Sequence, residues 1–333
     1  MSTLRIEARR GQAVESAHRV SVAVVDAEGR RVAAAGDARF PTFMRSAAKP
    51  FQAMPVVADG AAARFAITSA ELALACASHN SEWRQVEIVE GLLTRIGCKE
   101  SALACGPHRA LALDLGVHLA GESRPDDLWP AGRLASNCSG KHTAMLALAV
   151  SKGWPTDGYH RAGHPVQERC RGEVARWMDL RPEQIGEGID GCGVVSFQVP
   201  LEAMALGFAR LGVSDEPAAM AVRGAMLQHP ELVAGRRRLC TAAMQAYPGA
   251  VIAKVGADGV YGVTLPTRGL GVALKVEDGH PRATMVALVA VLERLELAPS
   301  PRETLSRFAE FPLVNTRDEP VGVMRASGDL TFE

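Results

Sequence analysis

The stretch VSVAVVDAEGRRVAAAG, residues 20–36, predicts a β-hairpin near the start of the chain. Residues 20–26 and 30–36 are two runs rich in β-branched and small apolar residues. The short polar segment Ala27-Glu28-Gly29 joins them, which is typical of a hairpin turn. Two strands are therefore expected before any helix.

Three further strands are predicted towards the C-terminus. They are short β-like runs separated by Gly-containing turns, typical of an antiparallel meander, and cover residues 250–256, 260–266 and 270–277. Pro281 then opens an apolar helix over residues 283–297, which we expect to cover one face of the sheet.

Between these two groups of strands the apolar residues repeat at helical spacing. We therefore expect an α+β fold, an α/β sandwich with a mainly antiparallel five-stranded sheet (two N-terminal and three C-terminal strands) flanked by helices and joined to a helical lobe. Residues 1–333 would form a single domain with two lobes: a mainly helical insert over 44–245, and a sheet lobe from 18–37 plus 250–297. The polar segment 317–333 is expected to be a peripheral extension.

The composition excludes several classes of protein. Lys and Arg number 37 against 37 Asp and Glu, so the chain lacks the basic charge of a nucleic-acid-binding protein. The hydrophobic share is 47% and the charged share 22%, as in chains that bury a core. The seven cysteines lack disulfide-scaffold spacing, the N-terminus lacks an apolar leader, and no apolar run could span a bilayer. We expect a cytoplasmic protein with reduced thiols and no membrane or nucleic-acid partner.

The segment Arg45-Ser46-Ala47-Ala48-Lys49-Pro50-Phe51 is the first candidate for chemistry. On a helical turn, Ser46 and Lys49 lie on one face, where a lysine can take the proton of a serine hydroxyl. Pro50 is tolerable only in the first turn of a helix, which would place Ser46 at the helix start. The alternative is an exposed helix start with a solvated lysine.

Two more segments carry polar groups of this kind. Ser78-His79-Asn80 precedes a predicted helix over residues 82–96, and the alternative to a functional role is a helix cap. Lys254-Val255-Gly256 ends the first strand of the meander, where the alternative is a solvent-facing lysine that protects a sheet edge.

Taken together, Ser-x-x-Lys, Ser-x-Asn and Lys-x-Gly occur in the order and on the elements typical of serine β-lactamases, penicillin-binding proteins and glutaminases, so the chain resembles that superfamily. A closer resemblance, over about residues 20–280, is to the asparaginase II family, the zinc-containing class 3 L-asparaginases of rhizobial type. It rests on five segments: Arg45-Ser46-x-x-Lys49-Pro50-x-Gln52, Ala77-Ser78-His79-Asn80, Cys105-Gly106-Pro107-His108, Asn137-Cys138-Ser139-Gly140-Lys141-His142 and Asp190-Gly191-Cys192-Gly193.

The resemblance implies catalysis by two Ser–Lys pairs, Ser46 with Lys49 and Ser78 with a lysine of the late sheet. We assign that lysine to Lys254, with Lys275 as the competitor. Either serine could be the nucleophile; we favour Ser46, with Ser78 relaying a proton at the leaving ammonia. Candidate substrate contacts in and beside these motifs are Arg45, His79, Asn80, Asp190 and Gly256.

The resemblance also implies a zinc site made by Cys138, Lys141 and Cys192. Spacing alone does not predict it, because the two sulfurs are far apart in sequence and lysine ligates a metal only as the neutral amine. The alternative is a set of buried cysteines beside a Gly-rich turn. If a metal binds, thiolates favour Zn²⁺ over Mg²⁺. No organic cofactor is expected.

The implied activity is hydrolysis of L-asparagine to L-aspartate and ammonia through an acyl-enzyme intermediate. The alternatives are a glutaminase, a penicillin-interacting serine hydrolase, or a catalytically silent amino-acid-binding protein. The family also implies a homodimer, as do the frequent two-fold assemblies of soluble proteins.

Overall fold

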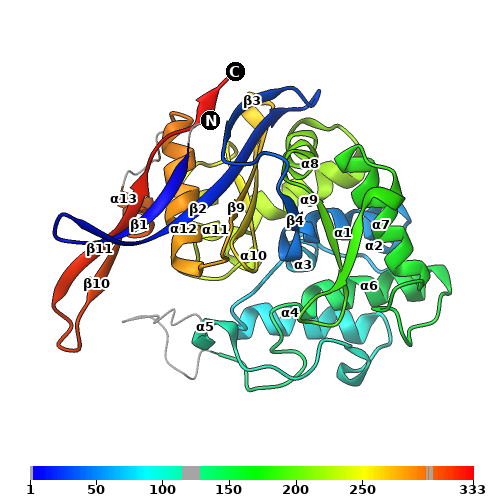
Figure 1. Cartoon of the computed structure of the whole chain (residues 1–333). Helices are drawn as coiled ribbons and strands as arrows, with labels where there is room; N and C mark the ends of the chain where they lie inside the picture. The colour runs from blue at the N-terminus through cyan, green and yellow to red at the C-terminus, as the bar shows by residue number, and fades with distance from the viewer. Residues whose placement is uncertain (1–2, 115–127, 298, 300–302) are drawn as a thin grey trace. The chain divides into compact units, whose positions relative to one another are not determined.

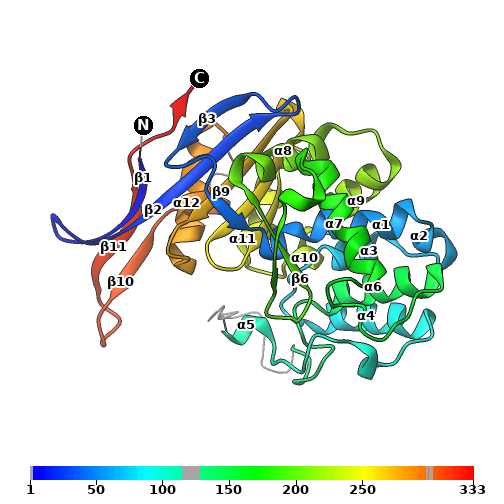
Figure 2. The same cartoon turned by 45° about the vertical axis from the view of Figure 1, so that its right-hand side comes forward.

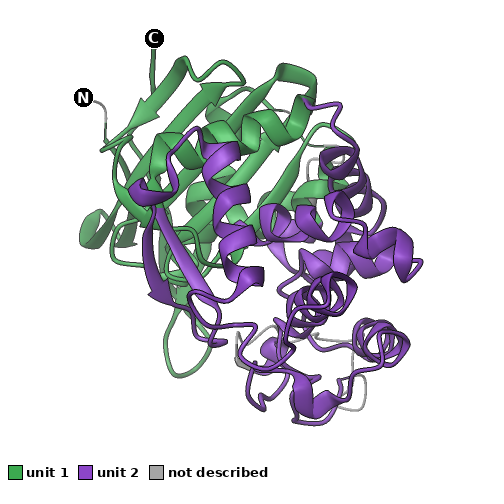
Figure 3. Cartoon of the chain, turned by 90° about the vertical axis from the view of Figure 1, so that its right-hand side faces the viewer, with its two compact units in different colours: residues 1–47, 199–213, 242–333 green, residues 48–198, 214–241 purple. Residues whose placement is uncertain are grey.

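The computed structural model describes residues 3–114, 128–297, 299 and 303–333 (Figure 1). The chain divides into two compact units (Figure 3). Unit 1 contains residues 1–47, 199–213 and 242–333, and unit 2 contains residues 48–198 and 214–241.

Unit 1 is built on one large sheet. Within the described residues its path runs β10-β11-β1-β2-β9-β8-β7, with β3 and β12 attached, which makes nine strands. The strands are β1 (Leu4–Arg10), β2 (Ala13–Asp26), β3 (Arg31–Ala35), β7 (Ile252–Gly256), β8 (Val260–Leu265), β9 (Leu270–Val276), β10 (Phe311–Val314), β11 (Pro320–Ser327) and β12 (Thr331–Phe332). A further short strand, β4 (Pro41–Phe43), lies just before residue 47, where the first segment of this unit ends.

The long strand β2 lies in the middle of this sheet (Figure 2). Its first half pairs antiparallel with β1, its second half pairs with β3, and its other edge pairs with β9. The register sets Val24 opposite Val272, so apolar side chains of the N-terminal and C-terminal strands lie side by side. The two ends of the chain are thereby joined in one sheet.

Helices of unit 1 cover this sheet. α8 (Leu201–Val213) packs on β2, β8 and β9, while α12 (Pro281–Arg294) packs on β1, β8, β9 and β11. Every residue of β8 is buried, as expected for a strand covered on both faces. Two glycines permit the close approach of α8: a Cβ at Gly271 would lie 2.0 Å from the carbonyl oxygen of Ala205, and one at Gly262 would clash with Phe208. The unit also contains α13 (Glu303–Ala309) and the 3₁₀ turn η5 (Pro266–Arg268).

Unit 2 is mainly helical. Its helices are α1 (Lys49–Ala58), α2 (Ala61–Arg64), α3 (Ser69–Ala75), α4 (Trp83–Arg95), α5 (Leu111–Asp114), α6 (Ser139–Lys152), α7 (Pro165–Met178), α9 (Pro217–Gln228) and α10 (Pro230–Val233). α1 packs against α6, α7 and α9 and is buried along most of its length. Short 3₁₀ turns are η2 (Glu100–Ala102) and η4 (Pro182–Gln184), and β5 (Gly186–Ile189) pairs antiparallel with β6 (Val195–Pro200). Three elements cross a unit boundary along the chain: η1 (Arg45–Ala48), β6 and α11 (Leu239–Ala246).

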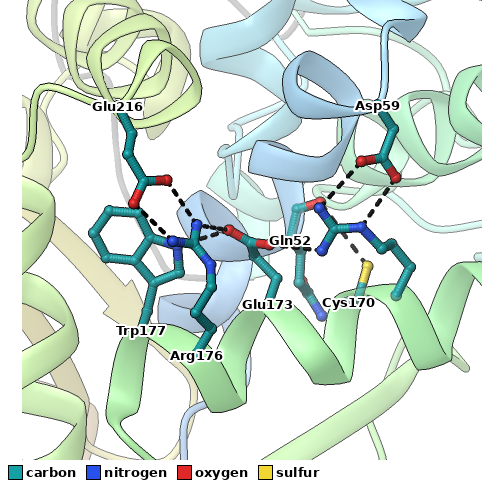
Figure 4. Close-up of polar contacts among 8 residues, drawn as sticks. Gln52, Asp59, Cys170, Glu173, Arg176, Trp177 and Glu216 are labelled. Atoms are coloured by element: carbon teal, nitrogen blue, oxygen red, sulfur yellow. Dashed lines mark hydrogen bonds and ion pairs between the residues drawn. The ribbon is translucent and has the colours of Figure 1, made fainter.

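A buried carboxylate on α7 connects two arginines of the same helix (Figure 4). Glu173, with a side chain only 3% exposed, accepts hydrogen bonds from Arg169 (2.6 Å), Arg176 (2.6 Å) and the indole Nε1 of Trp177 (2.7 Å). Burial alone would raise the pKa of Glu173, but these three donors outweigh it and lower the pKa below its usual value.

The same arginines reach other helices of unit 2. Arg169 forms a two-pronged ion pair with Asp59 at the end of α1, at 3.0 and 3.1 Å, and Arg176 pairs with Glu216 just before α9 at 2.7 and 2.9 Å. Fork-shaped guanidinium–carboxylate pairs fix orientation as well as distance. This network fixes α1, α7 and α9 to one another.

The five strands predicted from sequence are all present and share one sheet, but the predicted number was too small. β1, β10, β11 and β12 complete the sheet, and β11 pairs antiparallel with β1. The expectation of a peripheral polar extension over residues 317–333 was therefore wrong. Residues 320–327 of this segment form β11, whose side chains are mainly apolar and mostly half-buried, with Arg325 exposed.

The predicted helices over residues 82–96 and 283–297 correspond to α4 and α12. α12 lies against the sheet as expected. Among the described residues, no helix is both long and apolar enough to cross a membrane.

Candidate active site

Lys49 begins α1 and is almost completely buried, at 1% exposure. Pro50 follows in the first turn, where a missing backbone N–H costs nothing, and Ser46 lies in the preceding 3₁₀ turn η1, half-buried. The Lys49 Nζ donates a hydrogen bond to the Ser78 Oγ at 3.1 Å and another to the carbonyl oxygen of Ala77. The solvated-lysine alternative is thus wrong, and Lys49 contacts a serine that the sequence did not pair with it.

The Ser78 segment is held by backbone hydrogen bonds on both sides. The Ser78 N–H donates to the carbonyl of Val233 (2.9 Å), and the His79 N–H donates to that of Asn137 (3.3 Å). Ser81 adopts a left-handed conformation with φ of 69°. α4 is capped by Glu82, so the helix-cap alternative for Ser78 and Asn80 is wrong.

His79 supports this segment from inside the protein. Its Nδ1 accepts from the Ser81 N–H at 3.1 Å, which leaves Nε2 to donate to the Ser139 Oγ at 2.9 Å. Burial, followed by the nearby positive charges of Lys49 and Arg238, lowers the pKa of His79 to about 3. The imidazole is therefore neutral, with both nitrogens engaged in the protein.

Asn80 is fully buried and uses its whole amide. Its Nδ2 donates to the Glu82 Oε1 (3.1 Å) and to the carbonyl of Arg236 (3.1 Å), while its Oδ1 accepts from the Arg238 Nη1 (3.0 Å). A Cβ at Gly235 would lie 2.2 Å from the Asn80 Nδ2, so only glycine allows this approach. The same Nη1 lies 3.4 Å from the carbonyl oxygen of Ser78.

A second polar cluster joins the start of α6 to the turn after β5. The Lys141 Nζ lies 3.1 Å from the Cys192 Sγ, and a hydrogen bond links the Cys138 and Cys192 side chains. That bond, together with the charge of Lys141, outweighs burial and lowers the pKa of Cys192 to about 4. The same bond, followed by burial, raises the pKa of Cys138 to about 12, and its Sγ also donates a hydrogen bond to the Asn137 Oδ1 at 3.2 Å.

The negative charges around Lys141 change its pKa. Burial alone would lower its pKa, but Cys192, Cys138 and Asp190 outweigh burial and raise it. Asp190 lies in the turn that carries Cys192, where its Oδ1 accepts from the Gly191 N–H at 2.8 Å. The carboxylate therefore acts on the cluster through its charge.

His142 follows Lys141 in α6 and contacts Tyr159. The His142 Nδ1 is 2.6 Å from the Tyr159 Oη, which also accepts from the Ala104 N–H at 3.0 Å. Within the described part of the chain, the His142 Nε2 is buried and has no hydrogen-bond partner. Burial holds the pKa of His142 well below its usual value.

Cys138, Lys141 and Cys192 supply two sulfurs and one amine to one place, a donor set whose softness suits Zn²⁺. No group of three His, Cys, Asp or Glu side chains suited to a metal occurs among the described residues, so this set depends on the lysine as its third donor.

The remaining predicted residues belong to unit 1. Lys254 in β7 is 0% exposed and its Nζ donates to the carbonyl of Val255 (2.9 Å), so the solvent-facing alternative is wrong. A Cβ at Gly256 would lie 2.6 Å from the carbonyl oxygen of Met44. Lys275 is half-buried and binds the carbonyls of its own strand end.

Arg45 has a left-handed backbone conformation, with φ of 50°, and its guanidinium forms an ion pair with Asp258. Its charge is thus balanced inside unit 1. The pairs Ser46–Lys49 and Ser78–Lys254 each join residues of different units and stay predictions.

A sequence profile of the L-asparaginase II family matches residues 6–326, almost the whole chain. The chain belongs to the L-asparaginase II family. No curated protein matches its sequence.

This family member is also similar to two solved structures of Mglu, in its native and glutamate forms. They share 16% and 14% sequence identity with it, at TM-scores of 0.46 and 0.45. Each alignment covers 84% of this chain, which spans only 65% and 61% of the Mglu chains.

Arg238 was not among the predicted site residues. It lies in the run Arg236-Arg237-Arg238 after Gly235, far in sequence from the Ser78 segment that it contacts. Three consecutive arginines in a near-neutral chain were the available signal, but their contact depends on the tertiary fold.

Proposed function

We propose that this chain is an amidohydrolase that converts L-asparagine to L-aspartate and ammonia. The observation that carries the proposal is the buried contact between the Lys49 Nζ and the Ser78 Oγ at 3.1 Å, in a chain of the L-asparaginase II family. A serine hydroxyl becomes nucleophilic only when a neighbouring group takes its proton, and a buried lysine can do so.

The proposed reaction begins when Lys49, as the neutral amine, accepts the Ser46 proton and Ser46 attacks the side-chain amide carbon. The tetrahedral intermediate collapses, the C–N bond breaks, and ammonia leaves with a proton delivered through Ser78. Water then attacks the aspartyl ester, and Ser46 recovers its proton as L-aspartate is released. Lys254 is the proposed partner of Ser78, and its complete burial supports this choice over half-buried Lys275.

The nucleophile can be identified directly. The diazoketone analogue of asparagine, 5-diazo-4-oxo-L-norvaline, alkylates an activated serine, and peptide mapping finds the modified residue. The proposal expects modification at Ser46 and none in a Ser46→Ala variant. Modification at Ser78 would exchange the roles of the two serines, while no modification of either would contradict Ser–Lys catalysis.

We also propose that Cys138, Lys141 and Cys192 hold one Zn²⁺. The convergence of the Lys141 amine and the Cys192 thiolate supports this donor set. When bound, the zinc would supply a Lewis-acid centre. Because lysine ligates only as the neutral amine, binding would release a proton from Lys141.

The zinc proposal is tested on the protein itself by elemental analysis. The purified protein should contain about one zinc per chain, and a Cys138→Ser/Cys192→Ser double variant should contain none. Cys98→Ser is the matched control, because Cys98 lies outside this cluster and should leave the zinc content unchanged. Equal zinc in all three proteins would place the metal elsewhere.

A further inference from the structure

We propose that Arg238 is the residue that binds the α-carboxylate of the substrate, and that Asn80 orients it. The inference rests on the proposed function and names a specificity residue for the same site. Its basis is the hydrogen-bond network around the Ser78 segment in unit 2.

The first step concerns Asn80. The sequence motif made Asn80 a candidate substrate contact, yet its Nδ2 donates to Glu82 and to the Arg236 carbonyl, and its Oδ1 receives the Arg238 Nη1 at 3.0 Å. A carboxylamide has two N–H donors and one oxygen, and all of them are engaged here. Asn80 therefore has no polar atom left for a ligand, and its role is to orient the Arg238 side chain.

The second step concerns where Arg238 lies. Its Nη1 is 3.4 Å from the carbonyl oxygen of Ser78, whose Oγ accepts from Lys49. Arg238 is half-buried, so part of the residue is exposed to solvent. It is thus positioned at the same short segment as the lysine and serine of the proposed chemistry.

The third step concerns charge. Lys49 and Arg238 both place positive charge near the buried imidazole of His79, which is itself neutral. A planar guanidinium also matches the two oxygens of a carboxylate, so the α-carboxylate of an amino acid is the ligand chemistry that Arg238 fits.

The experiment compares two substrates that differ only in the carboxylate. L-asparagine has it, whereas 3-aminopropanamide keeps the amine and the side-chain amide without it. Arg238→Ala should lower kcat/KM for L-asparagine by about 10- to 100-fold, mainly through KM, and leave kcat/KM for 3-aminopropanamide within about twofold. Arg238→Lys, which keeps the charge but not the fork, should recover part of the loss.

The matched control is Arg84→Ala, because Arg84 is 67% exposed and its removal takes the same charge from unit 2. It should change neither substrate. Millimolar ethylguanidinium should partly restore turnover of L-asparagine by Arg238→Ala. An equal loss for both substrates would contradict the inference, since a merely structural residue affects them alike.

Calorimetry separates this inference from the proposed activity. L-aspartate carries the same α-carboxylate, so the wild-type protein should bind it at least about tenfold more tightly than Arg238→Ala does, whether or not ammonia is released. Equal affinity of the two proteins, or no binding by the wild type, would overturn the role of Arg238. Failure of ammonia release with a retained affinity difference would overturn only the hydrolase.

Discussion

A buried lysine nitrogen needs hydrogen-bond acceptors, and the Lys49 Nζ has the Ser78 hydroxyl and the Ala77 carbonyl. The hydroxyl can also pass a proton on, which the carbonyl cannot do. Removing the Ser78 hydroxyl leaves the buried lysine in place but takes away the group that would relay the proton.

Ser78→Ala should therefore lower kcat for L-asparagine by about 10²- to 10⁴-fold while the protein stays folded. Ammonia release under saturating substrate measures the effect. Ser69→Ala is the control, because Ser69 is an exposed residue of α3. A Ser78→Ala variant with the wild-type rate would show that the Lys49–Ser78 contact has no part in turnover.

Short sequence motifs identify single site residues better than they identify which residues contact one another. Lys49 and Ser78 are found from short motifs because their local segments carry the pattern. That Lys49 reaches Ser78, and that Arg238 reaches Asn80, depends on contacts between distant segments, which spacing alone does not contain.

Among the elements, α7 depends most clearly on one buried charge. Glu173 is 3% exposed and receives Arg169, Arg176 and Trp177 (Figure 4). Replacing one member of a buried charged network leaves the others unpaired in a poorly solvated place.

Glu173→Gln should lower the free energy of unfolding by about 3 kcal/mol, as measured by urea denaturation. Glu168→Gln, on the same helix but exposed, should cost about 0.5 kcal/mol or less. Equal effects of the two variants would contradict the importance of burial in this network.

The crossing of α6 and α3 gives a second prediction at this scale. A Cβ at Gly140 would lie 2.2 Å from the carbonyl oxygen of Leu74, so Gly140→Ala should destabilise the protein by about 3 kcal/mol. Gly172→Ala in α7 meets open space and should stabilise by about 0.5–1 kcal/mol. Thermal and urea denaturation distinguish these opposite signs.

Strands with apolar alternation and glycine turns were predictable, and β2, β3, β7, β8 and β9 are all found. β1 was missed because charged residues alternate with its apolar ones, and β11 because it lies in the segment that was expected to be a polar extension. They are strands because they pair with each other, which is a property of the sheet and not of either segment.

Acid sensitivity should be a property of the whole molecule. Burial, and then the charges of Lys49 and Arg238, lowers the pKa of His79 from its ordinary value of 6.5 to about 3, and burial holds the pKa of His142 well below its usual value. Below about pH 6.5 the unfolded chain therefore binds protons at these histidines that the folded chain does not bind. Stability is fully present above the unfolded pKa and is lost as pH falls towards the folded one.

As pH falls from 6.5 to 3, His79 alone should lower the free energy of unfolding by about 1.4 kcal/mol per pH unit. Urea denaturation at several pH values measures the slope. His79→Gln should be less stable near neutrality but have a flatter slope, whereas substitution of exposed His108 should leave the slope unchanged. The same slope in His79→Gln and wild type would contradict a neutral, buried His79.

The most direct test of the proposed function is ammonia release by the purified protein from L-asparagine and L-glutamine, with and without added zinc, beside a Lys49→Met variant of similar shape. We expect release from L-asparagine by the wild type, less from L-glutamine, and none from either by the variant. Absence of release from L-asparagine by the wild type, or turnover by Lys49→Met at the wild-type rate, would contradict a lysine-dependent asparagine amidohydrolase.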